Sequence, residues 1–70
     1  MRTHRYQITI LGGLGELGRE AFADFKIEYA DGSTLLAGDL DQAALYNALG
    51  RILALGLELV ALRRLDEVRA

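Results

Sequence analysis

The 70-residue chain contains no cysteine and no proline. Without cysteine it can form neither a disulfide framework nor a thiolate metal site. A chain that needs no covalent cross-link suits the reducing cytoplasm, and we expect a cytoplasmic protein. Without proline there is no proline-rich linker, and the length leaves room for a single small domain over residues 1–70.

Long apolar runs and a strong charge of one sign are also missing. The longest apolar stretches are only a few residues, which predicts no membrane span. The first residues lack the apolar core of a signal peptide, so we expect no export. The formal net charge of −2 gives no general attraction to nucleic acid, and we predict no nucleic-acid partner. The contents of 51% apolar and 26% charged residues are typical of a globular domain.

Residue types that perform catalysis or bind metals are scarce. His4 is the only histidine and Ser33 the only serine, so a histidine metal site or a Ser-His-Asp triad has little basis. We expect His4 on the surface of an edge strand. Most acidic residues are interpreted as caps, turns and solvated positions. The sequence therefore predicts no enzyme activity, no metal site and no cofactor.

The apolar pattern in the first half predicts two strands around a short helix, followed by a third strand. Alternation predicts a strand over residues 4–11, and helical spacing predicts a short helix from Glu16 to about Phe25. Residues 26–30 and 33–37 then flank Asp31-Gly32, a pair typical of a two-residue hairpin turn.

The second half predicts a longer helix and a last strand. Asp39 and Asp41 are candidate N-caps for a helix over residues 42–55, and Gly56 is suited to end it. Residues 57–62 predict a strand, and residues 66–70 a short charged tail. The β-α-β-β-α-β order indicates an α+β, ferredoxin-like fold with a four-stranded antiparallel sheet and two helices on one face. The expected core is Ile8, Ile10, Leu17, Phe22, Ile27, Leu36, Leu45, Leu49, Ile52 and Leu59.

Three glycines have the G-x-G-x-x-G spacing of a dinucleotide-binding turn, at Gly13, Gly15 and Gly18. Asp31 lies 18 residues after Gly13, close to where a ribose-binding acid would stand. However, Asp31 falls in the predicted hairpin turn, where two residues cannot form the helical crossover of a doubly wound sheet. We therefore interpret the glycines as a sharp turn into the helix.

Two other site types of this fold class are disfavoured. Residues 15–19 resemble the phosphate loop of acylphosphatases, and Asp31-Gly32-Ser33 resembles the turn after their catalytic asparagine. Glu28 stands where that asparagine would be, and the acids near residues 15–19 would repel a phosphate. RNA recognition needs aromatic side chains on the central strands. Tyr6 is the one aromatic residue there, and its alternation places it in the core.

The segment Asp41-Gln42-Ala43-Ala44-Leu45 and the residues after it resemble a group of small bacterial proteins without an established activity. These proteins share an LxG strand, a DQAAL helix and an LGLxL strand, and the resemblance covers residues 33–64 best. The resemblance implies that most of the shared residues cap a helix or lie in the core. Gln42 is the exception, a polar residue without an evident structural role. The relatives often carry histidine where this chain has Tyr46.

Two apolar surfaces are expected to stay exposed, and such patches often bind a partner. The helix-free sheet face and the outer edge of the long helix supply the candidate interface residues Leu11, Leu35, Val60, Leu62, Tyr46 and Leu53. We predict a non-enzymatic interaction or self-assembly module, a homodimer through the helix-free face or a sheet edge. The alternative is a small regulatory domain that binds an amino acid or a small anion at the Gly12–Gly18 loop, through Gly13, Gly15 and Arg19.

Overall fold

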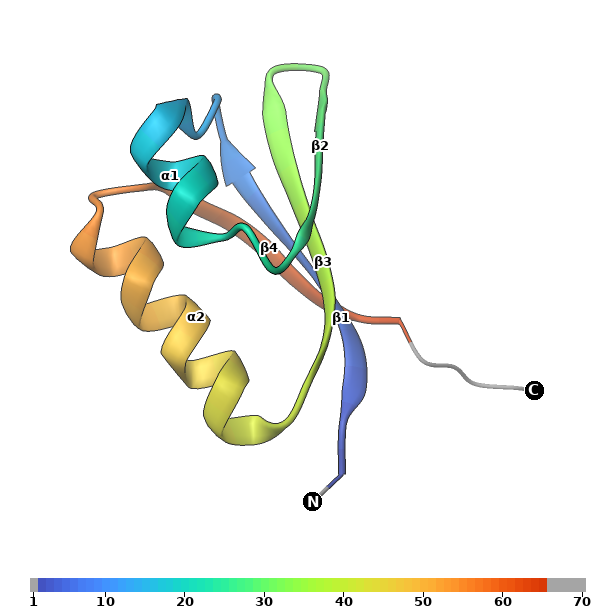
Figure 1. Cartoon of the computed structure of the whole chain (residues 1–70). Helices are drawn as coiled ribbons and strands as arrows, with labels where there is room; N and C mark the ends of the chain where they lie inside the picture. Colours follow the sequence, from blue (N-terminus) through green and yellow to red (C-terminus); the bar gives the residue numbers. More distant parts are fainter. Residues whose placement is uncertain (1, 66–70) are drawn as a thin grey trace.

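The structure is a computed structural model that describes residues 2–65 (Figure 1). The predicted charged tail at residues 66–70 lies outside the described residues. Along the chain the elements are β1 (His4–Leu11), α1 (Gly15–Ala21), β2 (Lys26–Ala30), β3 (Ser33–Leu40), α2 (Gln42–Ala54) and β4 (Leu59–Arg64). Within residues 2–65 no helix is long and apolar enough to span a bilayer.

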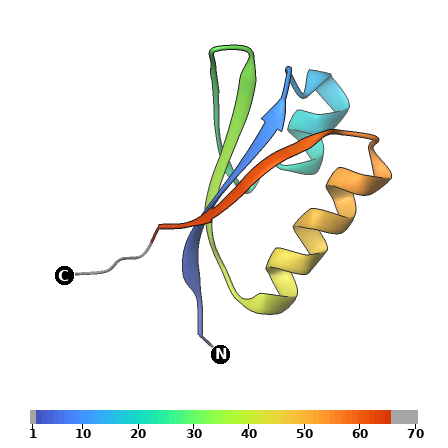
Figure 2. The ribbon, with the colours of Figure 1, turned by 180° about the vertical axis from the view of Figure 1, so that it is seen from behind.

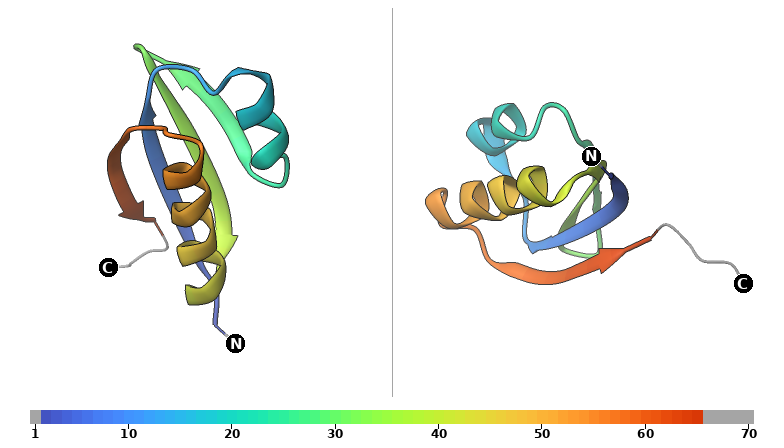
Figure 3. Two further views of the ribbon diagram at one scale, coloured as in Figure 1. Left: turned by 90° about the vertical axis from the view of Figure 1, so that its left-hand side faces the viewer. Right: turned by 90° about the horizontal axis from the view of Figure 1, so that it is seen from below.

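The described strands form one four-stranded sheet in the order β2-β3-β1-β4, with every neighbouring pair antiparallel. Both helices lie on the same face of this sheet, and the other face is open (Figure 3). The predicted α+β, ferredoxin-like architecture is therefore confirmed. It leaves β2 and β4 as the two edge strands.

The hairpin between β2 and β3 forms at the predicted position. Asp31 and Gly32 have φ values of 53° and 78°, the left-handed backbone that a two-residue turn of this kind requires. Their turn pairs Ala30 with Ser33. The turn fixes the predicted register, which pairs Ile27 with Leu36 and Tyr29 with Thr34. The acid that the dinucleotide pattern would need therefore lies in the hairpin turn.

Helix α2 begins and ends at the signals that the sequence contains. The Asp41 carboxylate accepts a hydrogen bond of 2.7 Å from the Ala44 backbone N–H, which makes Asp41 the N-cap. At the other end Gly56 has a φ of 71°. The N–H of Leu57 donates to the Ile52 carbonyl and the N–H of Gly56 to the Leu53 carbonyl, which together form a Schellman motif.

Helix α1 is shorter than predicted and ends at Ala21. Phe22 leaves the helical conformation, and a turn closes with a 2.9 Å hydrogen bond from the Phe25 N–H to the Phe22 carbonyl. The turn lets both phenylalanines enter the core, where their rings meet edge to face at 5.5 Å. The buried side of α1 carries Gly18, close to Leu14. Leu17 therefore points outward with 74% exposure, and its predicted place in the core is wrong.

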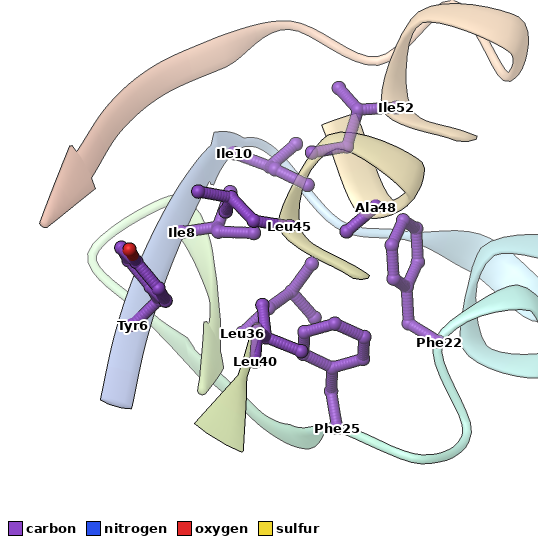
Figure 4. Packing of buried hydrophobic residues seen from close by; sticks show 10 residues of the cluster. All are labelled: Tyr6, Ile8, Ile10, Phe22, Phe25, Leu36, Leu40, Leu45, Ala48 and Ile52. Atoms are coloured by element: carbon purple, nitrogen blue, oxygen red, sulfur yellow. The ribbon is translucent and has the colours of Figure 1, made fainter. Parts of the chain in front are cut away.

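The core lies between the sheet and the two helices (Figure 4). Its buried residues are Tyr6, Ile8, Ile10, Phe22, Phe25, Leu36, Leu40, Leu45, Ala48 and Ile52. Two other predicted members, Ile27 and Leu49, are partly buried against this cluster. Leu59 is 44% exposed, so its prediction as a core residue is wrong.

Strand β4 starts two residues later than predicted. Leu57 is taken up by the end of α2, where its N–H completes the Schellman motif and its side chain packs against the core. The strand then pairs with β1 as far as Arg64. Figure 2, seen from behind, shows β4 returning from α2 to lie beside β1 at the edge of the sheet.

Candidate interaction surface

The register between β4 and β1 shifts by one residue, and this shift determines to which face of the sheet the β4 side chains project. Thr9 pairs with Ala61, whereas the next β1 residue, Ile10, pairs with Leu59. Val60 is therefore an extra residue, the mark of a β-bulge. A bulge shifts the alternation of the strand by one position.

Because of the bulge, both Leu59 and Leu62 lie on the helix side of the sheet. Directly paired residues of an antiparallel ladder project to the same face. Leu62 pairs with Ile8 and Leu59 with Ile10, and both isoleucines are buried under the helices. The expectation that Leu62 lies on the helix-free face is therefore wrong. Strict alternation predicted that position, and a bulge has no recognisable signal in this sequence.

The helix-free sheet face is consequently more polar than expected. Two complete rows of paired residues cross it from β2 to β4. One row is Lys26, Ala37, Gln7 and Arg63, and the other is Glu28, Leu35, Thr9 and Ala61. Leu35 is partly buried within its row, and Leu11 is exposed at the far end of β1. These two leucines lie on the helix-free face, whereas Leu62 lies on the helix side and Tyr46 and Leu53 belong to α2.

The remaining predicted residues lie on α2 and β4, which are at the same side of the molecule. Arg51 turns one side of α2 toward α1, because its guanidinium donates to the Ala21 carbonyl at the end of α1. Tyr46 and Leu53 lie about 140–160° around the helix from Arg51, on the opposite side. Figure 3 shows α2 between α1 and β4, so this opposite side faces the β4 edge. Tyr46 is 63% exposed and Leu53 81%.

We use the name α2–β4 flank for Tyr46, Leu49 and Leu53 of α2 together with Leu59 and Leu62 of β4. Leu49 is partly buried and lies between the core stripe of α2 and its exposed side. Leu59 and Leu62 are 44% and 41% exposed, since α2 lies over the middle of the sheet and leaves its β4 edge less covered. The name groups apolar residues, exposed or partly buried, of two neighbouring elements at one side of the molecule. Val60, at the bulge beside it, is also exposed.

Hydrogen bonds to β3 and to the hairpin turn hold the glycine loop. The Gly12 N–H donates to the Gly32 carbonyl at 2.7 Å, and the Thr34 hydroxyl donates to the Gly12 carbonyl at 2.6 Å. These bonds tie the loop to the hairpin turn. Gly13, Gly15 and Arg19 are exposed, and the described part of the chain encloses no pocket beside them.

The other candidate chemistry is equally sparse. His4 was expected on an edge strand, but it begins the central strand β1, is partly buried, and lies edge to face with Tyr6 at 6.4 Å. No group of histidines and acids suited to a metal ion occurs within residues 2–65. Gln42 is exposed in the first turn of α2.

Comparison with known proteins identifies the family. No curated protein and no solved structure matches the chain. A family model does match, over residues 5–63. This range includes all six elements except His4 at the start of β1 and Arg64 at the end of β4. Its description is a domain of unknown function, DUF8691. The match covers most of the chain, and the protein therefore belongs to the DUF8691 family.

Proposed function

We propose that this domain is a non-enzymatic self-association module, which forms a homodimer through the outer edge of β4 and the α2–β4 flank. The proposal is carried by the exposure of Tyr46 and Leu53 on α2 and of Leu59 and Leu62 on the edge strand β4, at the side of the molecule away from α1. Large apolar side chains scattered singly need no explanation, but a contiguous group on a small domain is typical of a protein interface.

The backbone of β4 supports the same surface. Within the described sheet β4 pairs only with β1, so its other side presents backbone N–H and C=O groups that can accept another strand. The residues from Leu59 to Leu62 are all apolar. A second strand placed there would satisfy these groups and would cover Leu59 and Leu62.

The opposite edge of the sheet is less suited to pairing. Strand β2 has five residues, and it exposes the charged side chains of Lys26 and Glu28. Short edge strands with charged residues, lysine above all, protect a sheet against further strands. Strand β4 has six residues, and its charged residues, Arg63 and Arg64, occupy only its last two positions, so Leu59 to Leu62 form an uncharged stretch of edge.

The test compares two leucines that are both highly exposed on helices. Leu53 belongs to the α2–β4 flank, whereas Leu17 lies on α1, so Leu17→Glu is a matched control for Leu53→Glu. Sedimentation at micromolar concentrations should show a dimer for the original chain and for Leu17→Glu. Leu53→Glu should raise the dimer dissociation constant by about tenfold or more, because a carboxylate would be buried in the interface.

Two results would contradict the proposal. One is a monomer of the original chain throughout the micromolar range. The other is equal weakening by the two substitutions, which would show that association does not depend on the α2–β4 flank.

A further inference from the structure

We infer that Asp31 is a modification site, at which this chain converts aspartate to isoaspartate through a cyclic imide with the Gly32 nitrogen, and that the hydrogen bonds between the glycine loop and the hairpin turn control the rate. The inference is independent of the proposed function, because it concerns the hairpin turn and not the α2–β4 flank.

The sequence around the aspartates singles out Asp31. It is the one aspartate of this chain that precedes a glycine. The side chain of a following residue hinders the attack of its nitrogen on the carboxyl group, and glycine has no side chain. The other aspartates are followed by residues with larger side chains, Phe25, Leu40, Gln42 and Glu67. Asp31 is therefore the aspartate at which a cyclic imide forms most readily.

The structure leaves both reacting groups accessible. Asp31 and Gly32 are exposed at the tip of the hairpin between β2 and β3 (Figure 1). Among residues 2–65, neither the Asp31 carboxylate nor the Gly32 N–H has a hydrogen-bond partner. No contact therefore holds the carboxyl group away from the nitrogen. Asp31 also has a φ of 53°, a conformation that costs free energy for a residue with a Cβ atom.

The reaction requires only solvent water. The Gly32 nitrogen attacks Cγ of the protonated Asp31 carboxyl group, and a C–N bond forms. The carboxyl hydroxyl and the nitrogen proton leave together as one water molecule. Water then opens the ring in one of two ways. Cleavage between the nitrogen and Cγ restores aspartate, whereas cleavage between the nitrogen and the main-chain carbonyl carbon gives isoaspartate of the same mass.

The folded turn opposes the ring closure. A five-membered ring needs the Gly32 nitrogen and the Asp31 Cβ on the same side of the Cα–C bond, and a type I′ turn keeps them on opposite sides. Rotation about this bond displaces Gly32, whose carbonyl accepts a 2.7 Å hydrogen bond from the Gly12 N–H. The Thr34 hydroxyl in turn holds the Gly12 carbonyl at 2.6 Å. The turn must therefore open locally before the ring can close, and the stability of these bonds sets the rate.

The product does not fit the turn. In isoaspartate the main chain passes through Cβ, which adds one backbone atom between Ala30 and Gly32. The two-residue turn that pairs Ala30 with Ser33 then loses its geometry, and the Gly32 carbonyl moves away from Gly12. Isomerisation of Asp31 therefore releases one of the bonds that hold the glycine loop.

Ageing of the full chain in neutral buffer tests the site. One sample is kept folded and another is unfolded in guanidinium chloride, and trypsin then releases residues 27–51 as one fragment. Asp39 and Asp41 lie in the same fragment and are internal controls. Mass spectrometry with electron-transfer fragmentation distinguishes isoaspartate from aspartate. Isoaspartate should accumulate at Asp31, about tenfold faster in the unfolded sample than in the folded one.

Two variants test the control of the rate by the glycine loop. Thr34→Val removes the hydroxyl that holds Gly12, so isomerisation in the folded chain should become about fivefold faster. Thr9→Val, on the open sheet face, should leave the rate unchanged. In the isomerised fraction of the original chain, the Gly12 N–H should exchange with solvent faster than in the unmodified fraction.

The outcomes that overturn the inference concern the site and the rate separately. Isoaspartate that appears first at Asp39 or Asp41, or at none of the three aspartates, overturns the site. Equal rates in the folded and unfolded samples, or equal rates in Thr34→Val and Thr9→Val, overturn the control by the hairpin turn. An unchanged exchange rate of the Gly12 N–H in the isomerised fraction overturns the release of the loop.

Discussion

A single hydroxyl in the core connects the glycine loop to the rest of the fold. Thr34 is buried in β3, and its hydroxyl donates to the Gly12 carbonyl at 2.6 Å. The Gly12 N–H donates to Gly32 in the hairpin turn. The Gly12 carbonyl is partly buried, and such a group that loses its partner costs more than an ordinary hydrogen bond contributes, because water reaches it poorly. Thr34 is therefore a structural residue that holds the loop after β1.

Replacing this threonine should destabilise the domain without changing its shape. Thr34→Val keeps the volume but removes the hydroxyl, so we expect the free energy of unfolding to fall by about 1–2 kcal/mol in urea denaturation. Thr9→Val, on the open sheet face of β1, is the control and should change stability by less than about 0.5 kcal/mol. Equal stability of the two variants would show that the Thr34 hydrogen bond contributes nothing.

At the scale of elements, α1 depends on its contacts with α2. It has seven residues, too few for an independently stable helix, and its N-cap residue Leu14 has an apolar side chain. Arg51 of α2 stabilises the C-terminal end of α1 and the turn that follows it. Its guanidinium donates to the Ala21 carbonyl, lies 5.4 Å from the centre of the Phe22 ring and is 3.9 Å from the Asp24 carboxylate.

Removing the Arg51 guanidinium should therefore weaken the attachment of α1. Arg51→Met keeps most of the aliphatic chain, and we expect a loss of about 1–2 kcal/mol in the free energy of unfolding. Amide exchange should accelerate first in α1, since local opening reflects local stability. Arg19→Met, an exposed change on α1 itself, is the control. A loss as large in Arg19→Met would mean that the charge of an arginine near α1, rather than this contact, stabilises the helix.

The elements also differ in how far their sequence predicted them. Strands β1 and β2 have the predicted bounds, and the hairpin has the predicted register. The alternation of apolar residues and the Asp31-Gly32 turn signal both act over only a few residues of the chain, so the sequence shows them directly. Helix α1 is shorter than predicted, since burying Phe22 and Phe25 in the core required a turn instead of further helix. The bulge in β4 arises from pairing with β1 and is not visible in β4 alone.

At the scale of the whole molecule, association and stability should be coupled. A domain of this size buries little core, and dimerisation stabilises only the folded state. We expect the Tm of the original chain to rise by about 3–5 °C for each tenfold increase in protein concentration. Calorimetry across the range in which sedimentation shows dissociation measures this shift. Leu53→Glu should show a Tm that changes much less with concentration, and a constant Tm in the original chain would contradict the coupling.

The sequence by itself determined the order of the elements, the hairpin at Asp31-Gly32 and the two ends of α2. Each of these depends on residues that are close together in the chain, such as a cap and the N–H groups that it satisfies. Only the tertiary structure decided which leucines remain exposed. Leu17, Leu59 and Leu62 have the spacing of ordinary amphipathic elements, but burial depends on whether another layer covers that side. The placement of α2 over the middle of the sheet and the bulge in β4 leave the flank open, and both arise from contacts between segments far apart in the sequence.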